Sequence, residues 1–153
     1  MKKKAQFYIL AAVLLLAITF GLFTAKKTIS SPEKTFNGIV DNYIREAPFA
    51  ANSGNLNDFT LKFYDYALEK DSNFEMLYLY LSDDNVTAFS LVKSTIFINE
   101  YSLSFNQTAN LTNTGTATVS IGTDQYVFNL TGSSLKAIFL SQKEGSRNVR
   151  LYQ

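Results

Sequence analysis

The feature that most constrains this chain is a run of 19 residues without a charge, from Phe7 to Ala25. A helix of that length rises about 28 Å, close to the thickness of the hydrocarbon core of a bilayer. Lysines stand on both sides of the run, at positions 2–4 and 26–27. Because a buried helix of a soluble domain does not need such flanks, the sequence predicts a transmembrane helix over residues 7–25.

The lysines also predict how the chain is oriented in the cell membrane. Three lysines and the amino terminus precede the run, two lysines follow it, and cytoplasmic flanks carry the excess of Lys and Arg. We therefore expect a single-pass protein with its N-terminus in the cytoplasm and its C-terminal domain outside. The expected parts are a basic head at 1–6, the span at 7–25, a juxtamembrane break at 26–32 and an extracytoplasmic domain at 33–153.

Ordinary removal of this leader is disfavoured by the residues around its end. A signal peptide has a shorter apolar core and small residues before the cleavage site, but Phe23 stands where a small residue is needed for a cut after Ala25. No Cys follows that could carry a lipid anchor. The sequence thus favours an uncleaved signal-anchor.

A third possibility comes from the basic head, Lys2-Lys3-Lys4-Ala5-Gln6, and the apolar helix after it. This arrangement resembles the class III signal of archaeal type IV pilins and related pilin-like proteins, and the resemblance ends at residue 25. It implies that a prepilin peptidase cuts between Ala5 and Gln6, and that residues 7–25 later pack against copies of the same chain. The chain departs from the bacterial pilin pattern at Leu10, where Glu is expected, and has Ala5 where Gly is common.

The composition beyond the leader is that of one folded domain without the usual reactive side chains. The whole chain is 46% hydrophobic and 14% aromatic, which is too apolar for a disordered protein. It contains no Cys and no His, which excludes disulfides, Cys/His zinc sites and His-based catalytic triads. From Thr28 onward, 9 basic and 13 acidic residues leave a net charge of −4. A domain of this charge is a poor partner for nucleic acid, because phosphate neutralisation supplies most of that affinity.

The spacing of apolar residues predicts two amphipathic helices after the break. Ser31 is a suitable N-cap with Pro32 at the first helical position, and Pro48 is expected to end the first helix. Residues 50–57 are small and polar and are predicted to form a loop, and Asn55 or Asn57 caps a second helix over 58–70. The expected buried stripes are Phe36, Ile39, Val40, Tyr43, Ile44 and Ala47 on the first helix and Phe59, Phe63, Tyr66 and Ala67 on the second.

From Phe74 the apolar period changes from 3.6 to 2, which predicts strands. We expect about seven short strands separated by turns: 74–81, 86–92, one within 95–105, 116–121, 125–130, 135–140 and 148–152. The predicted fold class is α+β: an N-terminal transmembrane helix, two amphipathic helices, and a small antiparallel β-sheet or sandwich.

Four Asn-x-Thr sequons lie beyond the apolar run, beginning at Asn85, Asn106, Asn110 and Asn129. Three fall in predicted turns, and Asn129 is expected on the outward side of its strand. Such sequons are acceptors for N-linked glycans in secreted domains, although a chain rich in Asn and Thr also produces them by chance. We consider all four as candidate glycosylation sites in an archaeal or eukaryotic host.

The remaining polar residues do not predict a catalytic, cofactor or metal site. Asp83-Asp84-Asn85 offers hard oxygens for Ca²⁺, but Asp and Asn between two apolar strands are the usual composition of a turn. Ser133 and Ser134 precede Lys136, and Ser141 precedes Lys143, yet an activated Lys must be buried and the 142–146 segment reads as an exposed hairpin. We expect no enzyme activity, no cofactor and no small-molecule substrate.

Two functions remain open. The first is a structural subunit of a pilin-like surface filament, in which residues 7–25 anchor the chain in the lipid bilayer and then pack against other copies. The second is a stand-alone membrane-anchored binding or accessory domain that does not polymerise. Processing at Ala5 and Gln6 distinguishes the two, because a pilin loses its basic head and a plain anchor keeps it.

Overall fold

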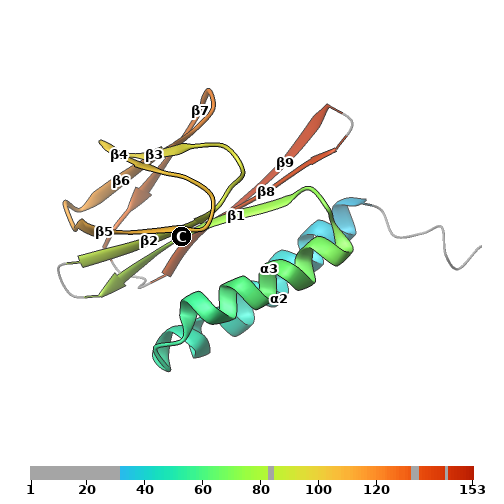
Figure 1. Ribbon diagram of the computed structural model, residues 1–153, viewed down its shortest axis with the longest axis horizontal. Helices are drawn as coiled ribbons and strands as arrows, with labels where there is room; N and C mark the ends of the chain where they lie inside the picture. Colours follow the sequence, from blue (N-terminus) through green and yellow to red (C-terminus); the bar gives the residue numbers. More distant parts are fainter. Residues whose placement is uncertain (1–31, 83–84, 132–134, 144) are drawn as a thin grey trace, which may run out of the picture. The chain divides into compact units, whose positions relative to one another are not determined.

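The computed structural model describes residues 32–153 except 83–84, 132–134 and 144. The chain divides into two units between Lys34 and Thr35, and the architecture below is that of the second unit. The described residues form two helices followed by nine strands, which make two antiparallel sheets (Figure 1), and the first helix begins three residues before the second unit. The predicted span at 7–25 and the processing residues Ala5 and Gln6 lie outside the described residues.

Helix α2 (Pro32–Asn52) is longer than predicted, because it continues through Pro48. Proline removes one helical hydrogen bond, but Ala51, one turn further on, is buried in the same core as the rest of the helix. Backbone bonds then close the end of the helix, from the Gly54 N–H to the Ala51 carbonyl over 3.0 Å and from the Ser53 N–H to the Phe49 carbonyl over 3.1 Å. Packing of the last turn therefore outweighs the bond that proline cannot make.

Helix α3 (Leu56–Lys70) begins at the N-cap Asn55. Phe63 and Ala67 of the predicted stripe are buried, and Phe59 is partly buried against the same core. Tyr66 was expected inside and is 42% exposed, whereas Tyr64 is buried. The Tyr64 ring lies 6.4 Å from that of Phe74 and 5.9 Å from that of Phe105. These aromatic neighbours follow α3 in the chain, so the rotation of the helix is set by tertiary contacts.

The first sheet, sheet A, has the order β5-β2-β1-β8-β9 and the second, sheet B, has the order β4-β3-β6-β7. All seven strand pairings are antiparallel. The strands of sheet A are β1 (Phe74–Ser82), β2 (Asn85–Leu91), β5 (Gln107–Thr112), β8 (Leu135–Lys143) and β9 (Ser146–Tyr152). Those of sheet B are β3 (Ile96–Ile98), β4 (Tyr101–Leu103), β6 (Thr116–Ile121) and β7 (Asp124–Asn129).

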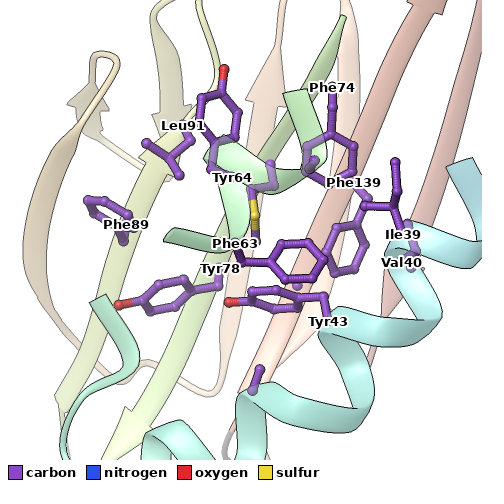
Figure 2. Packing of buried hydrophobic residues seen from close by; sticks show 14 of the residues in the cluster. Ile39, Val40, Tyr43, Phe63, Tyr64, Phe74, Tyr78, Phe89, Leu91 and Phe139 are labelled. Atoms are coloured by element: carbon purple, nitrogen blue, oxygen red, sulfur yellow. The ribbon is translucent and has the colours of Figure 1, made fainter. Parts of the chain in front are cut away.

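Sheet A lies between two hydrophobic cores, because alternate residues of its central strands point to opposite faces. Met76, Tyr78 and Phe139 belong to the core formed with α2 and α3, and Figure 2 shows Phe139 beside Tyr43 and Phe63 in that core. Leu77 and Ile138, one position away on the same strands, belong to the core shared with sheet B. The unit is therefore built in three layers: a helix pair, sheet A and sheet B.

The predicted fold class is wrong, since the described chain is mostly β with nine strands in two sheets rather than an α+β fold of about seven strands. The segment 95–105 forms the hairpin β3–β4, reversed at Asn99 with φ of 52°. Residues 107–112 are not among the predicted strands, but they pair with β2 as the edge strand β5. Strand β5 reads QTANLT, and only its Leu111 is buried. The segment therefore lacks the alternation of apolar and polar residues that would identify a strand from the sequence. Of the helices within the described residues, none has the length and hydropathy to cross a membrane.

Candidate functional site

The structure places the four predicted sequon asparagines at the surface. Asn85 is the first residue of β2, and Asn129 is the last residue of β7. Asn106 precedes β5 in a turn with φ of 57°, and Asn110 lies within β5.

Two of the sequons are brought together by the pairing of β2 with β5. Thr87, the acceptor threonine of the Asn85 sequon, is opposite Asn110 in the register of the two strands. The Thr87 hydroxyl donates to Oδ1 of Asn110 over 3.2 Å. Sequence reasoning missed this contact because β5 itself was not predicted.

The Asn129 sequon differs, because its amide and its hydroxyl contact each other. Thr131 donates to Oδ1 of Asn129 twice, from its hydroxyl over 2.7 Å and from its backbone N–H over 3.0 Å. Both residues are exposed. The sequence contained this signal, since an Asn side chain commonly binds backbone two residues later.

A pocket of about 250 Å³ opens where the start of α3 meets β1 and β2. Its polar lining includes Asn55, Asp58 and Thr87, and the Tyr78 hydroxyl donates to Oδ1 of Asn57 at its edge. Burial raises the pKa of Tyr78 above its usual value, so this hydroxyl remains a neutral hydrogen-bond donor at physiological pH. The lining residues can bind a polar molecule through hydrogen bonds.

A second pocket, of about 290 Å³, is bordered by charged residues that already have partners. The Glu75 carboxylate accepts the Lys93 backbone N–H over 3.3 Å, and Lys93 Nζ donates to the Ser72 carbonyl over 3.4 Å. Arg147 forms an ion pair with Asp124. The charged groups of Glu75, Lys93 and Arg147 therefore already bind neighbouring segments of the same chain.

The candidate Ser/Lys arrangement is not assembled among the residues for which the structure gives positions. Ser141 is buried, and its hydroxyl donates to Oδ2 of Asp71 over 2.5 Å, while Lys143 is exposed. The sequence had no signal for this Ser141–Asp71 contact, because the residues are 70 positions apart.

Four of the residues considered as candidate site residues lie outside the described residues: Ser133, Ser134, Asp83 and Asp84. Lys136, which follows the two serines, is a buried residue of β8. Within the described ranges, three or more His, Cys, Asp or Glu side chains nowhere gather closely enough to hold a metal ion.

Comparison of the chain with protein-family models, with curated proteins and with solved structures finds no match in any of the three.

Proposed function

We propose that this chain is a membrane-anchored structural protein whose domain lies outside the cell membrane, and that it is a subunit of a pilin-like surface filament. The observation that carries the proposal is the charge-free run at 7–25, with lysines on both sides and a folded domain after it. A mid-bilayer helix must be apolar over about 20 residues, and this run is the one stretch of the chain with that property.

The basic head supports the filament reading over other anchored proteins. Lys2-Lys3-Lys4-Ala5-Gln6 immediately before the apolar run resembles the site at which a prepilin peptidase acts. Removal of the head would leave the apolar segment next to the new chain terminus, and the resemblance to pilins implies that such segments then pack against one another. The β domain would then face solvent around the packed segments.

The packing of the domain is consistent with a structural role. Both faces of the central strands of sheet A are covered, one by the chain's own helices and the other by sheet B. The two pockets described above are lined by mixed polar and apolar residues. Contacts with other copies would therefore involve residues 7–25 and the outer surfaces of the unit.

The test is the intact mass of the protein extracted from its native membrane or cell surface. We expect a chain that begins at Gln6. Substitution of Ala5→Leu should block the cut, because a bulky residue replaces the small one before it, whereas the control Lys3→Arg keeps the charge and should be processed normally.

The alternative is a stand-alone anchored domain that binds a partner without polymerising. A native mass that retains residues 2–5 in both the unaltered chain and the Lys3→Arg control would overturn the filament proposal and favour this alternative. The polar pocket at the start of α3 would then be the first place to search for a ligand.

A further inference from the structure

Asn129 and Thr131 present an amide and a hydroxyl together at the exposed end of β7. The hydroxyl donates to the amide oxygen over 2.7 Å, and both side chains are open to solvent. We propose that Asn129 is the residue of this chain that carries an N-linked glycan. This inference rests on the extracytoplasmic placement proposed above, because glycans of this kind are added outside the cytoplasm.

The hydrogen bonds of the other three sequons set Asn129 apart. The hydroxyl of Thr87, which belongs to the Asn85 sequon, donates to the amide oxygen of Asn110 across β2 and β5. The hydroxyl of one sequon and the amide of another are therefore already hydrogen-bonded to each other. In the Asn106 sequon, the side chain of the middle residue, Gln107, accepts the Ser104 N–H over 2.8 Å. Among the described residues, Asn129 is the only sequon asparagine whose side-chain amide is hydrogen-bonded to the threonine of the same sequon.

The position of Asn129 in the sheet also leaves room for a sugar. Strand β7 is an edge strand of sheet B, with β6 as its only neighbour within the sheet. Asn129 alternates with the buried Phe128 and shares the outward face with Val127, which is 61% exposed. A glycan on Asn129 would extend into solvent and lie beside Val127, and it would hinder pairing of this edge with a strand from another molecule.

The chemistry is a single group transfer with an external donor. The Asn129 Nδ2 forms a bond to C1 of a sugar carried on a polyprenyl phosphate or diphosphate, and it loses one proton to a base of the transferase. The bond from C1 to the phosphate oxygen breaks, and the lipid phosphate leaves with its electron pair. No oxidant or reductant is needed.

The test is peptide mass mapping of the full chain isolated from the membrane of the cells that produce it. Cleavage before Asp and after Lys or Arg yields the peptide 124–136, in which Asn129 is the only sequon. The same cleavage separates Asn85 on 84–93 from Asn106 and Asn110 on 94–123. We expect a sugar mass on 124–136 and unmodified peptides for the other two segments.

Three variants make the result specific to the sequon. Asn129→Gln and Thr131→Val should both lose the sugar completely, the second while keeping the amide and the shape of the side chain. Thr131→Ser keeps the hydroxyl and should remain glycosylated. Because these residues are exposed, circular dichroism should show the same fold in all three.

A bare peptide 124–136 in the unaltered chain, or a sugar found only on 84–93 or 94–123, would overturn the inference. Protease treatment of intact cells separates this failure from failure of the proposed function. If the domain is digested and Asn129 is bare, the placement stands and only the glycan assignment is lost. If the domain is protected, the placement outside the membrane is wrong as well.

Discussion

The hydroxyl of Tyr43 lies 2.9 Å from Oγ1 of Thr60, in a buried hydrogen bond that joins α2 to α3. The Tyr43 ring also packs in T-shaped geometry with the rings of Phe63 and Phe139, with centroids 5.1 and 5.4 Å away. One side chain thus connects both helices with sheet A (Figure 2). Because Tyr43 and Thr60 are both fully buried, neither polar group can find water if the other is removed.

Replacing Tyr43→Phe should therefore lower the free energy of unfolding by about 1–3 kcal/mol, the cost of leaving the Thr60 hydroxyl buried without its partner. Urea denaturation of the full chain in detergent measures this loss. The double variant Tyr43→Phe/Thr60→Val removes both polar groups and should recover most of it. If the double variant is no more stable than Tyr43→Phe, the hydrogen bond is not the source of the effect.

Stability should fall at high pH because burial raises the pKa of both Tyr43 and Tyr78 above the usual tyrosine value of 10.0. Above pH 10 the folded state keeps these two protons while the unfolded state releases them. The contribution of the two tyrosines to the free energy of unfolding is therefore constant well below pH 10 and falls as the pH rises above it. The expected slope is about 1.4 kcal/mol per pH unit for each tyrosine. Denaturant midpoints at several values between pH 8 and about 11 give the slope. A midpoint in Tyr43→Phe that decreases as steeply as in the parent would rule out a contribution from Tyr43.

Pro48→Ala should stabilise the protein by about 1–3 kcal/mol, because Pro48 lies inside α2 and alanine restores a helical N–H without a steric clash. Thermal denaturation followed by circular dichroism detects the gain. The chain has only one other proline, Pro32, and it is the first residue of α2. Pro32→Ala is the matched control and should give no such gain, since that N–H has no helical partner. Equal effects at the two positions would contradict this account.

Phe139→Ala should destabilise the protein by about 3–5 kcal/mol, because it opens a cavity in the core between the helices and sheet A. Phe139 is fully buried, whereas Phe97, also on a strand, is 50% exposed. Phe97→Ala is therefore expected to cost far less in the same urea titration. A similar loss for both variants would mean that the helix-side core does not dominate stability.

Leu15→Arg should release the protein from the membrane or prevent its insertion, since a charge at the middle of an apolar span costs at least about 2.5 kcal/mol. Leu15→Ile keeps the residue apolar and serves as the control. Carbonate extraction followed by fractionation measures the distribution between membrane and soluble pools. Unchanged membrane association of Leu15→Arg would contradict the proposed anchor.

Several local features were predictable from the sequence, because they depend on neighbouring residues. Of the predicted first stripe, Ile44 is only partly buried. Its other members are buried as their spacing predicts: Phe36, Ile39, Val40, Tyr43 and Ala47. The hydrophobic 74–81 segment is a central strand with both faces covered, as its lack of alternation indicates. The 135–140 and 148–152 segments pair as β8 and β9.

The errors arose where distant contacts outweighed local signals. Pro48 predicts a helix end, but the burial of Ala51 against the core carries α2 further. Tyr66 and Tyr64 are equally apolar, and only the positions of Phe74 and Phe105 decide that Tyr64 is inside. Strand β5 exists because β2 offers it a backbone partner, and side-chain periodicity does not report backbone pairing.

The sequence by itself determined the apolar run at 7–25, the absence of Cys and His, and the positions of the four sequons, since these are properties of residue identity and spacing. The tertiary structure decided which sequons are hydrogen-bonded to one another and which lies at the edge of sheet B. It paired Thr87 with Asn110 across two strands and placed Asn129, whose bond to Thr131 is local in sequence, on the edge strand β7 of sheet B. The physical reason is that hydrogen bonds form between groups close in space, and strand pairing makes residues 23 positions apart neighbours.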